Sequence, residues 1–241
     1  FPDPHIASFF WGMTFPFALS LSLQASEKLS RVAFLVLLIT ILIADILTFS
    51  RGGYFAMGLA SLVCFSLFFP SIFRKHLRAL ALSAILLSAV LLIPNPLSSR
   101  LFSSLDLSDH STSSRLAIWS EALHIIAQHP LVGVGLGNYS NTVKPSADYR
   151  EPRYAHNTFL DIAAETSIVN SILFFLLLAF PIIRALKRSS VSLKFATGAS
   201  LLIFSAHSLF ETPLYSVHVL PLLLALIALT VADSETIPEE S

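Results

Sequence analysis

Long apolar runs alternate with short polar connections along the whole chain. Seven of these runs are long enough to cross a bilayer, which takes about 20 residues in helical form. They span roughly 6–24, 32–49, 54–72, 77–93, 159–183, 195–211 and 217–232. Because lipid offers the backbone no hydrogen-bond partners, such runs are expected to be helical. We therefore predict an all-α, polytopic transmembrane helix bundle of about seven spans.

One connection, residues 94–155, is much longer than the others. Loops beyond about 15 residues are usually functional or disordered. Apolar side chains recur within it at the spacing of one helical face, at Leu116, Trp119, Leu123 and Ile126. This pattern predicts an amphipathic helix from Ser114 to Gln128 that ends before Pro130. Such a helix suits either the membrane interface or packing against the other helices.

Composition supports a membrane protein. The chain is 54% hydrophobic and only 12% charged, whereas an ordinary soluble domain is about 25% charged. A core in water has no room for that much apolar surface, so the lipid bilayer is the expected surrounding. The net charge of +0 gives no basic surface for nucleic acid, and the single cysteine, Cys64, has no partner for an internal disulfide.

Lysine and arginine indicate the orientation. If the spans alternate in direction, the basic residues of three short connections share one side: Lys28, Arg31, Arg74, Lys75, Arg78, Arg184, Lys187, Arg188 and Lys194. The positive-inside rule makes that side cytoplasmic. The expected organisation is spans 1–4 within residues 1–93, an extracytoplasmic loop over 94–155, spans 5–7 within 156–232 and an acidic cytoplasmic tail over 233–241. Because the chain begins at Phe1 in a loop-like run, we expect it to be a fragment that lacks upstream spans.

Two arginines on the predicted outer face are candidates for binding an anion. Arg51 precedes Gly52 and Gly53, which would let a ligand approach the backbone closely; an interfacial arginine that snorkels is the alternative. Arg115 is expected near the first turn of the loop helix, where a cation opposes the helix dipole unless an anionic ligand also binds there. A solvated arginine without a ligand is the alternative for Arg115.

His156 is the candidate for proton transfer, because histidine exchanges protons near neutral pH. It stands before Asn157, at the start of the fifth apolar run. The alternative is a cap or a hydrogen-bonded structural residue. The other histidines show no spacing typical of zinc ligands, so no metal site is predicted.

Four carboxylates fall within the predicted spans, at Asp45, Asp161, Glu165 and Glu211. They are costly in lipid unless paired or hydrated, so they would line the outer site, balance arginines, or relay protons in a transporter. The glycine-rich run from Gly133 to Asn138 lacks the spacing and context of a nucleotide-binding motif and predicts a tight turn.

Taken in order, these residues resemble the O-antigen ligase and polymerase superfamily. The matching motifs are Ser50-Arg51-Gly52-Gly53, Arg115 with Trp119, the run from His129 to Tyr139, and His156-Asn157 with Leu160. They cover residues from about 50 to 170. Ser167 and Asn170 depart from the pattern, since the family commonly has glycines after the position of Glu165. Family members usually have more spans, so the chain would be a C-terminal portion.

The resemblance implies a membrane glycosyltransferase that uses no metal and no cofactor. It would move a glycan from undecaprenyl pyrophosphate to an acceptor hydroxyl, on the lipid A core or similar, at the periplasmic face of the bacterial inner membrane. Arg51 and Arg115 would bind the pyrophosphate, with Gly52 and Asn157 also at the substrate, and His156 would act on the acceptor. An O-antigen or exopolysaccharide polymerase is the alternative within the superfamily, and a membrane transporter is the alternative of another class.

Overall fold

The computed structural model describes residues 3–68, 110–143, 154–186 and 192–232. Its helices are α1 (Pro4–Gln24), α2 (Lys28–Ile46), α3 (Arg51–Phe68), α6 (His110–Gln128), α7 (Tyr139–Val143), α8 (Thr158–Glu165), α9 (Ile168–Leu186), α10 (Leu193–His207) and α11 (Val219–Ala232). There is no strand among the described residues, so the all-α prediction is confirmed. Three stretches are long and apolar enough to cross a membrane: Pro4–Gln24, Lys28–Ile46 and Ile168–Ala185. The span predicted at 77–93 and the tail 233–241 lie outside the described residues.

The chain divides into two compact units. The first comprises Phe1–Ala60, Leu173–His207 and Pro213–Ser241, and the second comprises Ser61–Ile172 and Ser208–Thr212. Each unit therefore collects segments that are far apart in the sequence. The second unit takes only a short segment, residues 208–212, from the C-terminal part of the chain.

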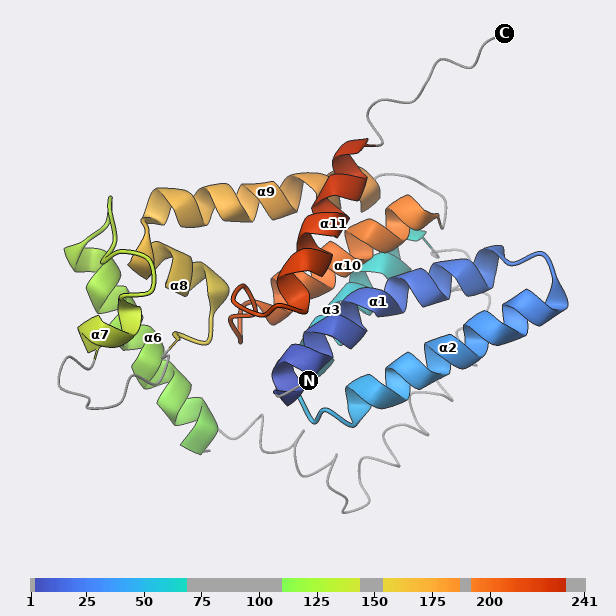
Figure 1. Cartoon of the computed structure of the whole chain (residues 1–241), viewed down its shortest axis with the longest axis horizontal. Helices are drawn as coiled ribbons and strands as arrows, with labels where there is room; N and C mark the ends of the chain where they lie inside the picture. Colours follow the sequence, from blue (N-terminus) through green and yellow to red (C-terminus); the bar gives the residue numbers. More distant parts are fainter. Residues whose placement is uncertain (1–2, 69–109, 144–153, 187–191, 233–241) are drawn as a thin grey trace, which may run out of the picture. The chain divides into compact units, whose positions relative to one another are not determined.

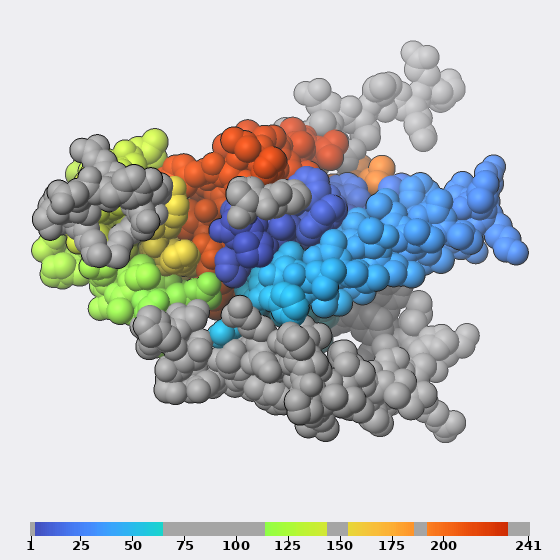
Figure 2. Space-filling view, turned by 60° about the horizontal axis from the view of Figure 1, so that its bottom comes forward, coloured from blue at the N-terminus to red at the C-terminus, as the bar shows by residue number. Residues whose placement is uncertain are grey.

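The first unit is built on a pair of adjacent helices. Helices α1 and α2 run side by side in opposite directions, and α10 also packs against α1 (Figure 1). The packing of α1 against α10 is close, because Ser200 Oγ donates to the Met13 carbonyl at 2.6 Å and the Phe9 ring stacks on His207 with centroids 3.7 Å apart. The lighter blue surface of α2 lies beside the dark blue surface of α1 in Figure 2.

Helix α2 exposes most of its apolar side chains. Within it only Ile41 and Asp45 are buried. Its exposed apolar residues include Val32, Leu35, Val36, Ile39, Leu42 and Ile43. A helix that presents apolar residues on nearly every side suits a lipid surrounding.

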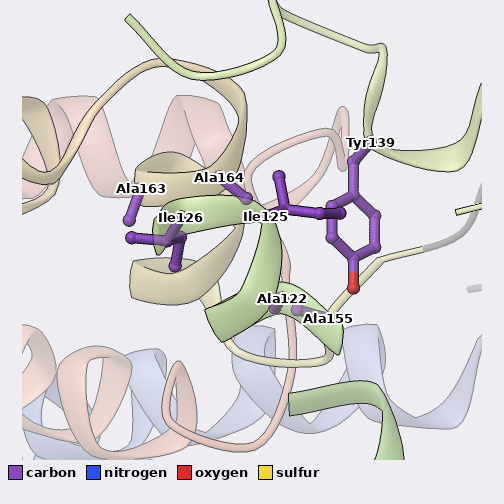
Figure 3. Close-up of a cluster of buried hydrophobic side chains, with 7 residues drawn as sticks. All are labelled: Ala122, Ile125, Ile126, Tyr139, Ala155, Ala163 and Ala164. Atoms are coloured by element: carbon purple, nitrogen blue, oxygen red, sulfur yellow. The ribbon is translucent and has the colours of Figure 1, made fainter. Parts of the chain in front are cut away.

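The second unit has its own small apolar core, made by α6, α7 and α8 (Figure 3). Its buried members are Ala122, Ile125, Ile126, Tyr139, Ala155, Ala163 and Ala164. The amphipathic helix predicted from Ser114 to Gln128 is therefore confirmed as α6, and it packs on other helices. Of the predicted face, Ile126 is buried, whereas Leu116 and Leu123 are more than half exposed. Ile125 and Ile126 of α6 share one apolar core with the small residues Ala163 and Ala164 of α8.

The fifth predicted span, 159–183, is wrong as a single helix. The structure has α8 and α9 with a break at Thr166 and Ser167. The predicted glycine turn causes the break, since it binds the carbonyls that end α8: Val134 N–H donates to Ala164 O and Gly135 N–H to Glu165 O, both at 2.9 Å. These two hydrogen bonds satisfy carbonyls that a longer α8 would otherwise pair within the helix, so α8 can end there.

Candidate functional site

The site is assembled around the start of α8. Asn157 caps this helix, since its side-chain oxygen accepts from the backbone N–H groups of Phe159 at 3.0 Å and Leu160 at 3.2 Å. The preceding residue, His156, has a φ of 50°, a left-handed conformation that costs about 1–3 kcal/mol for a non-glycine residue. Such strain persists only where neighbouring contacts fix the backbone, and it is concentrated at functional sites. The observed role of Asn157 is capping, and its contact with substrate stays a prediction.

Residues 208–212 are tied to α8 by three hydrogen bonds. Thr158 N–H donates to Ser208 O at 2.8 Å, and Thr158 Oγ1 donates to the Glu211 carbonyl at 2.9 Å. Thr212 Oγ1 donates to Asp161 Oδ2, while Asp161 Oδ1 accepts from Ala155 N–H at 2.7 Å. These bonds fix both the loop that carries His156 and the segment that carries Glu211.

The side chain of Glu211 contacts both predicted catalytic residues of the second unit. Its Oε1 lies 2.5 Å from His156 Nδ1, and its Oε2 lies 3.8 Å from a terminal nitrogen of Arg115. The Glu211 side chain is only 11% exposed, whereas those of Arg115 and His156 are 23% and 40% exposed. The structure thus brings Arg115 and His156 together around one buried carboxylate, with both of their side chains partly exposed.

Sequence reasoning placed Glu211 inside a membrane span, which is wrong. Helix α10 ends at His207, four residues earlier. The available signal was Pro213, because a proline disfavours a helix at the residues just before it. The pairing of Glu211 with Arg115 and His156 joins positions far apart in the sequence, so no local pattern could reveal it.

The hydrogen bond from His156 to Glu211 changes the acid–base chemistry of the imidazole. It raises the pKa of His156 above the ordinary value of 6.5, against the opposing effects of partial burial and of the Arg115 charge. The negative charges of Glu211 and Asp161 add to the increase. His156 is therefore a stronger proton acceptor than an isolated histidine.

The sequence suggested that Arg115 lies near the first turn of its helix, and the structure places it one turn later. Helix α6 begins at His110, so Arg115 is in the second turn. Joint binding of an anion by the first-turn N–H groups and the Arg115 guanidinium stays a prediction.

His156 forms part of the wall of a cavity of about 840 Å³ in the second unit. The other lining residues are Ser114, Ala117, Ile118, Ser120, Glu121, His124, Tyr139, Val143 and Tyr154. Burial and the carboxylates of Asp161 and Glu165 raise the pKa of Tyr154, which keeps its phenol protonated and able to donate a hydrogen bond. Hydroxyl, carboxylate and aromatic groups of this kind suit a polar ligand such as a sugar. Within the described ranges, no group of three or more His, Cys, Asp or Glu is placed to hold a metal ion.

Arg51 and its glycines belong to the first unit. Arg51 is the first residue of α3, and Ser50 before it accepts a hydrogen bond from Gly53 N–H at 3.3 Å. A Cβ at Gly53 would overlap Ser8 Oγ, so close helix packing requires this glycine. Gly52 is buried, and its contact with substrate stays a prediction, as does a shared role of Arg51 with Arg115 and His156.

A family comparison identifies the class of protein. The family model for O-antigen ligase matches residues 33–175, a range that includes Arg51, Arg115 and His156. The chain belongs to the O-antigen ligase family. A comparison with curated proteins found no match. The family consists of membrane glycan transferases of the ligase or polymerase type, so the resemblance inferred from the motifs is confirmed. Glu211 lies beyond the matched range.

Proposed function

We propose that this O-antigen ligase family protein transfers a glycan from undecaprenyl pyrophosphate to an acceptor hydroxyl, on the lipid A core or a similar acceptor. The reaction takes place at the periplasmic face of the bacterial inner membrane and uses no metal. The observation that carries the proposal is the pairing of Arg115 and His156 around Glu211, with His156 in the wall of a cavity. In a glycan transferase, a cation and a base held by one carboxylate would provide the two functions that the reaction needs.

The proposed reaction is a single displacement at the anomeric carbon. Nε2 of neutral His156 takes the proton of the acceptor hydroxyl, whose oxygen forms the new bond to the anomeric carbon. The bond from that carbon to the pyrophosphate oxygen breaks, and the electron pair leaves with undecaprenyl pyrophosphate. The configuration at the anomeric carbon is inverted. General base catalysis of this kind contributes about 10²–10⁴-fold to a rate.

The arginines would stabilise the leaving pyrophosphate. Arginine carries a permanent charge and a planar fork of N–H donors that matches phosphate oxygens. Such donors are most effective where water is scarce and their positions are fixed in advance. Arg115 would bind one part of the pyrophosphate and Arg51 another. Gly52 and Asn157 are proposed substrate contacts because each adjoins one of the reacting groups.

The test uses cells that lack the gene and carry the full-length gene with Arg115→Ala or His156→Ala. We expect envelope glycan transfer to fall by on the order of 10²-fold or more in each case. Matched controls are Arg184→Ala and His218→Ala, two exposed residues of the first unit, and both should retain transfer. Normal transfer by both Arg115→Ala and His156→Ala would contradict the assigned roles.

The polymerase reaction is the alternative within the family, with a second lipid-linked repeat as acceptor. The two reactions leave different products when the gene is deleted. Long chains that remain unlinked on the carrier lipid indicate a ligase, and acceptor capped with single repeats indicates a polymerase. We expect the unlinked chains.

A further inference from the structure

Glu211 is well placed to control the chemistry of His156. It is 8% exposed as a whole residue, and its backbone and its neighbour Thr212 are bonded to the first residues of α8. The carboxylate therefore has a fixed position relative to the His156 loop. A fixed carboxylate beside an imidazole determines how that ring is oriented and which nitrogen carries its proton.

We infer that Glu211 is a positioning residue of the active site: its carboxylate holds the proton of neutral His156 on Nδ1, so that Nε2 faces the acceptor as a base. The inference rests on the proposed function, because it assigns Glu211 a role through His156. It concerns a residue outside the range matched by the family model.

The tautomer follows from the short contact. An ionised carboxylate only accepts hydrogen bonds, so at 2.5 Å from Glu211 Oε1 the His156 Nδ1 must carry a hydrogen. Neutral imidazole has one N–H and one lone pair, which then lies on Nε2. Without the carboxylate the two tautomers would both be populated and the ring would be free to rotate, so a smaller fraction of molecules would present a base.

The contact with Arg115 is weaker and has a different consequence. At 3.8 Å the Glu211 carboxylate attracts the guanidinium without forming a close bidentate pair. Arg115 is thus held near His156 while its N–H donors can still turn to phosphate oxygens. One carboxylate thereby sets the spacing between the proposed base and the proposed cation.

Other charged groups around His156 act on the same equilibrium. Arg115 lowers its pKa, Asp161 raises it, and the hydrogen bond to Glu211 has the largest effect. Replacing Glu211 with glutamine removes the negative charge but leaves an oxygen that can accept from Nδ1–H. The variant therefore separates the effect of charge from the effect of orientation.

The experiment measures transfer by the purified full-length protein from polyprenyl-pyrophosphate-linked glycan across a range of pH. In Glu211→Gln the acidic limb of the kcat profile should move to lower pH, because the imidazole loses its proton more easily. In Glu211→Ala kcat should fall on the order of 10²-fold while KM for the acceptor changes less than about 2-fold. Glu211→Asp should restore part of kcat. Glu27→Gln, an exposed carboxylate without a side-chain capping bond, is the matched control and should match the wild type.

A purely structural role for Glu211 predicts another outcome, in which each variant loses activity only as its folded fraction falls and the acidic limb stays in place. That outcome, or a Glu211→Ala variant with normal kcat, would overturn the inference. If Glu211→Ala does not fold, the pH profile of Glu211→Gln still decides. His156→Ala separates the two levels: retained transfer there contradicts the proposed function itself, whereas loss there with normal Glu211 variants contradicts this inference alone.

Discussion

At the residue scale, the site combines one strained histidine with one buried carboxylate. His156 has a left-handed backbone, and both of its neighbours in the chain are fixed by hydrogen bonds, Ala155 to Asp161 and Asn157 to the start of α8. The sequence identified Arg115 and His156 by residue type and motif. It could not identify their common partner, Glu211, because that contact depends on where α10 ends and how residues 208–212 return to α8.

Arg115→Lys tests whether the shape of the cation matters as well as its charge. Lysine keeps the charge but lacks the planar fork, so it would lose at least one charge-assisted hydrogen bond to phosphate, worth about 1.5–3 kcal/mol. We expect the initial rate of glycan transfer to fall about 10–100-fold. A rate for Arg115→Lys equal to that of the wild type would show that charge alone is sufficient.

The raised pKa of His156 also predicts how stability depends on pH. A raised pKa means that the folded state favours the protonated ring. This contribution is therefore fully present below the ordinary value of 6.5 and is lost as the pH rises through the folded-state pKa. The difference in unfolding midpoint between the wild type and Glu211→Gln should be larger at pH 6 than at pH 9, measured by thermal denaturation in detergent. An equal difference at both values would speak against the charged pair.

At the element scale, periodicity predicted the helices better than their faces and ends. The helix from Ser114 to Gln128 was found, but Leu116 and Leu123 of its predicted face are exposed, whereas Ile126 is buried with Ala163 and Ala164 of α8. The run 159–183 was apolar enough for one helix, and the glycine turn from another part of the chain divides it. Hydropathy reports only burial or lipid contact, so it cannot locate a break that a distant turn creates.

Gly133→Ala tests that turn. Gly133 has a φ of 61°, and a Cβ there would overlap the backbone of Glu165. Gly137 has a φ of 73° with no heavy atom within 4 Å of the added Cβ, so Gly137→Ala carries the backbone strain without the overlap. We expect Gly137→Ala to destabilise by about 1 kcal/mol and Gly133→Ala by clearly more. Equal unfolding midpoints for the two variants would contradict the close approach of the turn to α8.

At the scale of the whole molecule, composition and charge predicted a membrane protein, and apolar helices together with the family match confirm it. The motifs led to the family because they lie in order along residues 50 to 170. The joining of residues 208–212 to the second unit was beyond sequence reasoning, since it depends on tertiary hydrogen bonds and not on composition. The orientation of the chain remains a prediction from its lysines and arginines.

Cysteine labelling in intact cells tests the orientation. In a Cys64→Ser background, Leu136→Cys places a thiol on the exposed glycine turn, and Ser26→Cys places one between α1 and α2. A maleimide that does not cross membranes should label Leu136→Cys in cells whose outer membrane has been removed, and Ser26→Cys only after lysis. The reverse pattern would place the second unit in the cytoplasm and exclude a periplasmic site.

The proposed reaction depends on His156 as the base in a glycan transfer. The decisive assay compares wild type and His156→Ala as purified full-length protein, with a labelled glycan on polyprenyl pyrophosphate and a defined acceptor. We expect the single-turnover rate of His156→Ala to fall on the order of 10²-fold or more while donor binding is retained. A wild-type rate for His156→Ala would contradict it.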